Sequence, residues 1–173
     1  KGEIMTLNLP DTIKFVITDF DGIVTDNCVY IDSKGEMTRK LNFKDVMAFS
    51  ILRKNGYHIG IVSGEKNSAI EIIAKKFKVE EVHQDIRVKI DVIKSIVERY
   101  KLKEDEFVYI GDDINDLESL NFAKYAITVP DAVNQVKAIE GIQITTAHGG
   151  WLFSSATVWN NLSIIPSGFS SST

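Results

Sequence analysis

The sequence has little cysteine, no long apolar run and no concentration of basic residues, and each absence excludes a class of protein. The single cysteine, Cys28, cannot form an internal disulfide, and no spacing of Cys and His indicates a zinc site. No apolar run approaches the roughly 18 residues that span a bilayer, and no signal-peptide pattern precedes Ile13. We therefore expect a cytoplasmic protein with no membrane partner.

The charge is modestly acidic, with 20 Lys and Arg against 24 Asp and Glu and a net charge of -4. Nucleic-acid binding usually requires a basic face, so we expect no nucleic-acid partner. The Gly-x-x-x-x-Gly-Lys-(Ser/Thr) motif of P-loop enzymes is also absent. At 173 residues and 44% hydrophobic content, the chain is long enough for one domain with a sizeable core.

The most informative stretch is the apolar run 13–18, which ends in Asp19 and Asp21. A continuous run of β-branched and aromatic residues is typical of a buried strand in a parallel sheet. Ligands bind at the carboxyl ends of such strands, and in extended geometry both carboxylates project to the same side. Because two adjacent like charges repel, this pair requires a cation, a shared proton or a catalytic role.

Strands and helices alternate along most of the chain. Strands are predicted after the first at 57–62, 81–83, 107–110, 125–129 and 142–145, with helices in each interval between 44 and 142. This alternation predicts an α/β fold with a doubly wound, Rossmann-like parallel sheet.

A small β-hairpin flap is predicted at about residues 28–43, directly after the acidic pair. Lone hairpins are marginal in water, so we expect it to pack on another surface, such as a neighbouring subunit. The chain divides into an N-terminal leader (1–12), a main domain (13–150) and a C-terminal tail (151–173).

Polar groups lie at or just beyond four predicted strand ends: Asp19 with Asp21, Ser63, Lys89, and Asp112 with Asp113. The carboxyl ends of parallel strands converge, so these groups can share one cleft. Carboxylate oxygens suit Mg²⁺, and a hydroxyl and an ammonium suit phosphate oxygens. Phosphoryl transfer requires a nucleophile, a metal, cations and a proton donor, so the set predicts a Mg²⁺-dependent phosphatase.

The order of these motifs resembles the haloacid dehalogenase superfamily, whose first motif, Asp-x-Asp-Gly-(Thr/Ile/Val), stands here at 19–23. By this resemblance, Asp19 is the nucleophile that forms an aspartyl-phosphate, and Asp21 is the general acid and then the base. Ser63 and Lys89 hold the phosphoryl group, and Lys89 also places Asp19. The implied metal ligands are Asp19, the Asp21 backbone carbonyl, Asp112 and, in support, Asp113.

Further motifs resemble a capless branch that includes 3-deoxy-D-manno-octulosonate 8-phosphate phosphatases and ketodeoxynonulosonate 9-phosphate phosphatases. The matching segments are 20–26, 41–45, 111–116 and 149–150, within a resemblance that covers residues 13–150. It implies a haloacid dehalogenase-like phosphatase domain, a phosphorylated keto-sugar acid as substrate, and a homotetramer whose hairpins meet at the centre.

The branch also indicates where substrate contacts lie. Ser63-Gly64-Glu65-Lys66 resembles the nonulosonate enzymes, since octulosonate enzymes usually carry Arg after the Gly. The family's Arg-Glu segment beyond Gly149-Gly150 is absent here, so a nine-carbon acid is favoured over an eight-carbon one. The predicted substrate-binding residues are Gly22, Thr25, Lys44, Gly64, Glu65 and Lys66.

Other interpretations compete with the catalytic one. Ser63 could cap a helix, and Lys89 could be a solvated lysine, with Arg87 and Lys94 as nearby alternatives. The chain could be a non-catalytic oligomerisation or regulatory domain, related to the C-terminal domains of some acylneuraminate cytidylyltransferases. The enzyme is favoured because a non-catalytic domain need not keep the intact Asp19, Asp21, Lys89 and Asp112. A receiver domain is disfavoured because a double Asp after the fourth strand does not fit its pattern.

Overall fold

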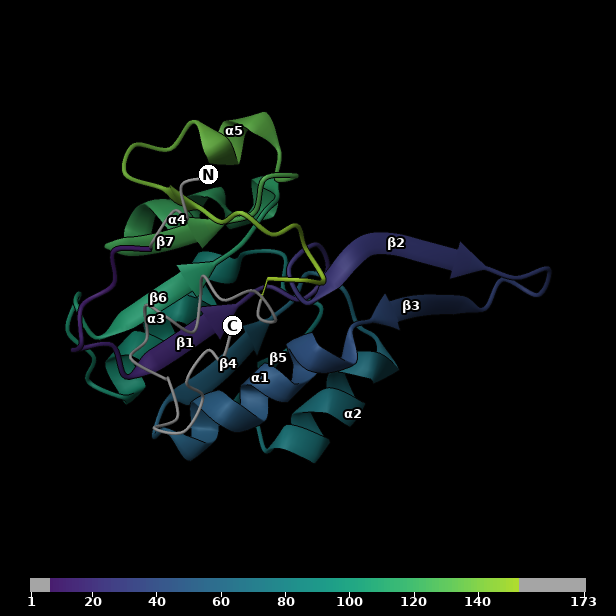
Figure 1. The fold of residues 1–173 in the computed structure, drawn as a ribbon, viewed down its shortest axis with the longest axis horizontal. Helices are drawn as coiled ribbons and strands as arrows, with labels where there is room; N and C mark the ends of the chain where they lie inside the picture. The colour runs from purple at the N-terminus through teal and green to yellow at the C-terminus, as the bar shows by residue number, and fades with distance from the viewer. Residues whose placement is uncertain (1–6, 153–173) are drawn as a thin grey trace, which may run out of the picture.

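The computed structural model describes residues 7–152 and contains a six-stranded parallel sheet with helices on both faces (Figure 1). The prediction of a doubly wound α/β fold is confirmed. Across the sheet the strands run in the order β5 (Glu81–His83), β4 (His58–Val62), β1 (Phe15–Thr18), β6 (Phe107–Ile110), β7 (Tyr125–Thr128) and β8 (Gln143–Ile144).

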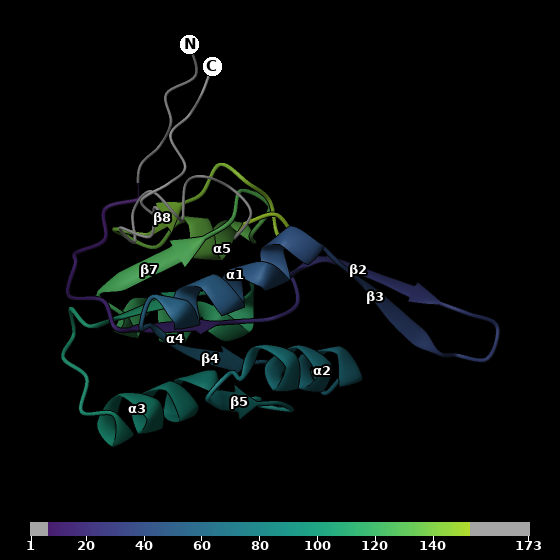
Figure 2. The same ribbon diagram turned by 60° about the horizontal axis from the view of Figure 1, so that its bottom comes forward.

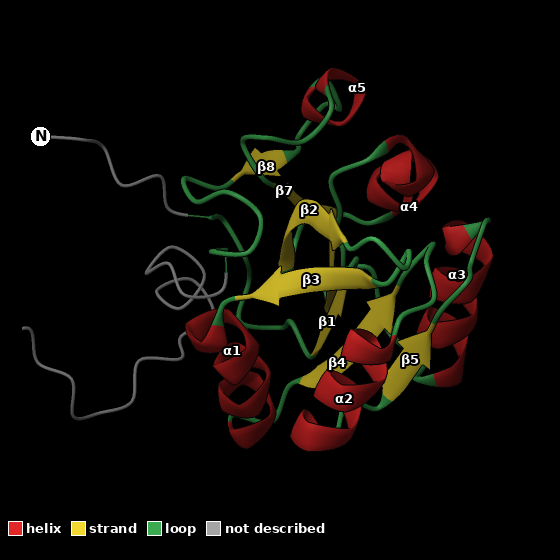
Figure 3. Ribbon diagram, turned by 90° about the vertical axis from the view of Figure 1, so that its right-hand side faces the viewer, coloured by secondary structure: helices red, strands yellow, loops and turns green. Residues whose placement is uncertain are grey.

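The helices form two layers, one on each face of the sheet (Figure 3). On one face α1 (Phe43–Lys54) contacts α2 (Ser68–Phe77), whose apolar stripe is buried. On the other, α4 (Leu117–Phe122) contacts both α3 (Lys89–Arg99) and α5 (Asn134–Lys137). This division follows from right-handed crossovers that run in opposite directions along the sheet, first from β1 through β4 to β5 and then from β5 through β6 and β7 to β8. No helix within residues 7–152 is long and apolar enough to cross a membrane.

Strand β1 lies at the centre of the sheet and organises the site. All four of its residues are buried, and it pairs in parallel with β4 on one side and β6 on the other. The strand order reverses here, which makes it the topological switch point where ligands of open α/β sheets bind. The residues that follow β1, β4 and β6 are Asp19, Ser63 and Gly111.

The predicted hairpin is formed by β2 (Thr25–Ile31) and β3 (Met37–Leu41), and it projects beyond the carboxyl edge of the sheet (Figures 1 and 2). Strand β2 begins three residues before the hairpin start predicted at about residue 28. Val29, Tyr30, Ile31 and Met37 near the turn are 43–66% exposed. The projecting end of the hairpin therefore carries an apolar surface.

The two ends of the chain are described only in part. The predicted leader is described from Leu7, and the predicted tail as far as Leu152; residues 153–173 lie outside the described part. Leu7 and Leu152 are both buried in the main core, whereas Trp151 is exposed.

Candidate active site

A buried lysine joins two carboxylates at the centre of the site. Lys89 begins α3, its side chain is fully buried, and its Nζ lies 2.7 Å from Asp19 Oδ2 and 2.8 Å from Asp116 Oδ1. Asp19 also accepts a hydrogen bond from the backbone N–H of Phe20. Because a charged lysine is buried only when it is paired, this geometry excludes the solvated-lysine interpretation of Lys89.

Asp116 has a role that was not predicted from the sequence. Tyr109 donates its hydroxyl to Asp116 Oδ1, and the backbone N–H groups of Asp112 and Asp113 donate to Oδ2. The short 3-10 helix η1 (Ile114–Asp116) places Asp116 there, and Asp113 caps it. With Lys89 included, Asp116 accepts four donors and is held rigidly under the strand ends.

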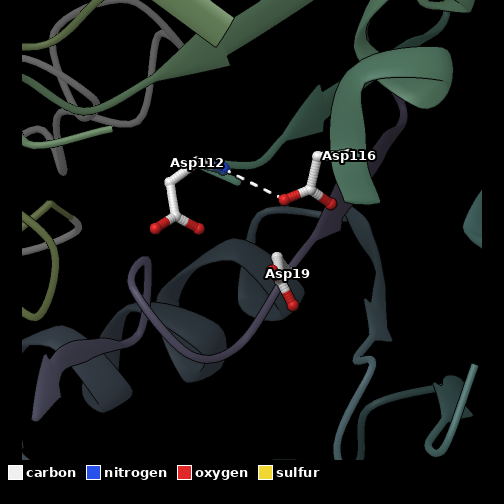
Figure 4. Close-up of side chains that lie close together, drawn as sticks. All are labelled: Asp19, Asp112 and Asp116. Atoms are coloured by element: carbon white, nitrogen blue, oxygen red, sulfur yellow. Dashed lines mark hydrogen bonds between the residues drawn. The ribbon is translucent and has the colours of Figure 1, made fainter. Parts of the chain in front are cut away.

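The side chains of Asp19, Asp112 and Asp116 lie close together (Figure 4). One oxygen each from Asp19, Asp112 and Asp116 lie within 4.8 Å of one another. Both oxygens of Asp116 are already occupied by donors, whereas Asp112 Oδ1 is buried with no hydrogen-bond partner among residues 7–152. A buried oxygen without a partner is what a hard cation would satisfy, so Asp19 and Asp112 fit a Mg²⁺ site better than Asp116 does.

The charge balance supports the same conclusion. Burial first, and then the charges of Asp116 and Asp113, raise the pKa of Asp112 to about 7. Burial and Asp116 also raise the pKa of Asp19 well above its usual value. Burial lowers the pKa of Lys89, but Asp19 and Asp116 outweigh it and the net shift is upward. The site thus holds more carboxylate groups than the single charge of Lys89 can neutralise, and a bound divalent cation would neutralise the excess negative charge.

Glycines allow the loops to pack closely around the acids. Gly22 has φ +84°, and a Cβ there would lie 2.0 Å from Asp112 Oδ2. A Cβ on Gly149 would lie 1.9 Å from the Gly22 carbonyl oxygen, and Gly150 donates its N–H to the Ile23 carbonyl. The Gly149-Gly150 pair therefore covers the acidic loop, which gives this motif a structural role.

Asp21 is held by a residue from the hairpin. Its Oδ1 accepts hydrogen bonds from Arg39 Nε at 2.8 Å and from the Thr25 hydroxyl at 3.2 Å. Its Oδ2 is buried and has no hydrogen-bond partner among the described residues. Strand β2 and the hairpin turn separate Asp21 from Arg39 in the sequence, and no sequence pattern indicated that the two side chains are in contact.

A cavity of about 360 Å³ opens over these groups. Of the predicted residues it brings together Asp19, Asp21, Ser63, Gly64, Glu65, Asp112 and Asp113. The other predicted residues do not line it: Gly22, Thr25 and Lys89 are buried, and Lys44 and Lys66 are exposed. The residues that line it without having been predicted are Asn27, Ile86, Arg87 and Asn115.

Known proteins resemble this chain in sequence. Residues 79–149 match the family model of haloacid dehalogenase-like hydrolases. The curated 3-deoxy-D-manno-octulosonate 8-phosphate phosphatase of Escherichia coli K12 is 21% identical over 122 residues, which cover 70% of this chain and 65% of that protein's length. These findings confirm the resemblance to the haloacid dehalogenase superfamily that the motifs indicated.

Solved structures share the fold. A Moraxella catarrhalis 3-deoxy-D-manno-octulosonate 8-phosphate phosphatase, solved with magnesium, phosphate and the sugar acid, has a TM-score of 0.80 at 24% identity and covers 88% of this chain and 91% of its own. A Streptomyces avermitilis protein assigned to the haloacid dehalogenase hydrolase family has a TM-score of 0.82 at 28% identity, with coverages of 92% and 91%.

Proposed function

We propose, from the premise that this chain resembles haloacid dehalogenase-like hydrolases in sequence and fold, that it is a Mg²⁺-dependent phosphatase acting on a phosphorylated keto-sugar acid. The observation that carries the proposal is the fully buried Lys89 bridging Asp19 and Asp116 below an acidic cavity. A buried ion cluster of this kind costs desolvation energy and is poor evidence for stability, so its place at the strand ends favours a catalytic role.

In this mechanism the carboxylate of Asp19 attacks the phosphorus atom, and the bond to the sugar oxygen breaks. Asp21 gives its proton to that leaving oxygen. A water molecule then loses a proton to Asp21 and attacks the aspartyl-phosphate, which releases inorganic phosphate and restores Asp19. One carboxyl group thus serves as acid in the first step and as base in the second.

The remaining residues hold the reacting groups in place. Lys89 fixes Asp19 through Oδ2, and the 1% exposed Ser63 lines the cavity as a donor for a phosphate oxygen. Asp19, Asp112 and the Asp21 carbonyl would hold Mg²⁺, with Asp113 in support. When bound, the ion supplies positive charge for the phosphate oxygens as negative charge moves to the leaving group.

The substrate class is inferred from the relatives and from the cavity mouth. The Escherichia coli relative acts on an eight-carbon acid phosphate, whereas the Glu65-Lys66 pair favours a nine-carbon one. Glu65 lines the cavity. Phosphate release with Mg²⁺ should be measured over a panel of eight- and nine-carbon keto-sugar acid phosphates, with Asp19→Asn as the inactive control.

Two results would contradict the proposal. If the intact chain turns over no phosphomonoester, it is the non-catalytic oligomerisation or regulatory domain considered above. If Asp19→Asn turns over substrate as well as the wild type does, Asp19 is not the nucleophile. Equal efficiency on both acids would remove the basis for preferring the nine-carbon one.

A further inference from the structure

Among the described residues, Arg39 is the one hairpin residue that forms an ion pair with an acid lining the cavity. Its Nε lies 2.8 Å from Asp21 Oδ1, and the two side chains are 11% and 22% exposed. The residues are 18 positions apart in sequence, and Arg39 belongs to β3 rather than to the sheet of the main domain. An ion pair this well shielded is screened much less by water and salt than a surface pair.

We propose that Arg39 is a positioning residue, which orients the Asp21 carboxyl group for proton transfer and so couples the hairpin to the chemistry. This inference rests on the proposed phosphatase function. Arg39 and Thr25 both donate to the same oxygen, Oδ1. Two donors on one oxygen restrict rotation of the carboxyl group and leave the other oxygen to exchange the proton.

The position of the other oxygen agrees with this role. Asp21 lines the cavity, and its Oδ2 is buried without a hydrogen-bond partner among residues 7–152. A buried polar atom with no partner is uncommon, and at a reaction site it marks the atom that receives a partner from the substrate or from water. Oδ2 is therefore the oxygen that we assign to proton transfer.

The irregular pairing of the hairpin favours the contact. Thr25 pairs with Leu41 and Val29 pairs with Arg39, so four positions on β2 correspond to two on β3. Asn27 within this bulge has φ +59°. Bulges bend a strand and re-aim its side chains, and this one lies at the root of the hairpin, where Arg39 meets Asp21.

The neighbouring Lys40 provides a matched control. It lies on the same strand with the opposite orientation, is 55% exposed, and pairs with Asp26 rather than with Asp21. Lys40→Ala removes one positive charge from β3 without touching the Asp21 carboxyl group. Any effect of Arg39 substitution on β3 folding or on net charge should appear in Lys40→Ala as well.

The test compares two leaving groups in the full chain with Mg²⁺. We would measure kcat/KM for 3-deoxy-D-manno-octulosonate 8-phosphate or ketodeoxynonulosonate 9-phosphate, whichever is turned over faster, and for p-nitrophenyl phosphate. The sugar alkoxide needs a proton to leave, whereas p-nitrophenolate does not. Because kcat/KM covers only steps up to departure of the leaving group, the later role of Asp21 as base does not affect the comparison.

General acid catalysis typically contributes about 10²- to 10⁴-fold, so misplacing the acid should cost a substantial part of that. We expect Arg39→Ala to lower kcat/KM about 10- to 100-fold more for the sugar phosphate than for p-nitrophenyl phosphate. Arg39→Lys should recover part of the loss, and Lys40→Ala should match the wild type on both substrates.

An equal loss on both substrates in Arg39→Ala would overturn the positioning role while leaving the phosphatase function intact. Wild-type activity on the sugar phosphate retained in Arg39→Ala would overturn it as well. If the wild type turns over neither compound nor any phosphomonoester of the panel, the proposed function itself fails and the role of Arg39 fails with it.

Discussion

Replacing Lys89 with Met tests the buried ion cluster most directly. Met has a similar length and no charge, so it fills the space of the lysine stem while removing the ammonium group. Asp19 and Asp116 then face each other, each having lost a charged partner that lies 2.7 or 2.8 Å away in the wild type. Breaking a buried ion pair by removing one partner typically costs about 3–5 kcal/mol, and we expect a loss of that size at pH 7.5.

The loss should depend on pH, because protonation can replace the missing cation. In the variant, the pKa of Asp19 should rise further above that of the unfolded chain. The folded state then holds a proton that the unfolded state has released. At pH values between the pKa of the unfolded chain and that of the folded variant, the free energy of unfolding falls by about 1.4 kcal/mol per pH unit as pH rises. The deficit relative to the wild type should therefore shrink as pH is lowered from 7.5 to 5.

Urea denaturation followed by circular dichroism at pH 7.5 and 5 measures both effects. Lys94→Met on the same helix is the matched control, because that side chain is exposed and lies over the Phe122 ring; we expect a change below about 1 kcal/mol. Adding Asp116→Asn to the Lys89 variant should restore part of the stability. A loss below about 1 kcal/mol, or one that does not change with pH, would refute the buried ion cluster.

Three further predictions follow from the site and the hairpin. Asp112 has a pKa of about 7 and must lose its proton to bind a cation. The Kd for Mg²⁺, measured by calorimetry, should therefore rise about tenfold for each unit that pH falls below 7. A Kd that stays constant from pH 6 to 8 would contradict this. Gly22→Ala should weaken Mg²⁺ binding, because the added Cβ would displace Asp112. Gly35→Ala is the control: Gly35 also has a positive φ, but nothing lies within 4 Å of the added Cβ, so this variant should lose stability without losing Mg²⁺ affinity. Equal Mg²⁺ affinities in the two variants would count against the Gly22 contact. On the exposed face of the hairpin, Ile31→Asp should dissociate the expected homotetramer in a sizing measurement, and a monomeric wild type would contradict that assembly.

The sequence was most informative where one local rule was sufficient. Asp19, Ser63 and Asp112 each follow a buried apolar strand, and the sheet order places those strands side by side. Convergence at the carboxyl edge is a property of every parallel sheet, so the central groups could be predicted without knowing the packing. Arg39 could not, because its contact with Asp21 depends on a bulge and on the path of the hairpin, which no periodicity encodes.

The acids after β6 show a second limit of sequence-based prediction, since Asp112, Asp113 and Asp116 are chemically identical. The turn η1 gives each a different environment: Asp113 caps it, and Asp116 points inward to Lys89 and Tyr109. Asp112 is left with a buried oxygen and a pKa raised to about 7. This short helical turn thus gives the three acids different roles: Asp113 caps the turn, Asp116 binds Lys89, and Asp112 is a candidate metal ligand. The spacing of three residues between Asp113 and Asp116 permits the capping box, but the roles of Asp112 and Asp116 depend on burial and on contacts with Lys89 and Tyr109 that the spacing does not encode.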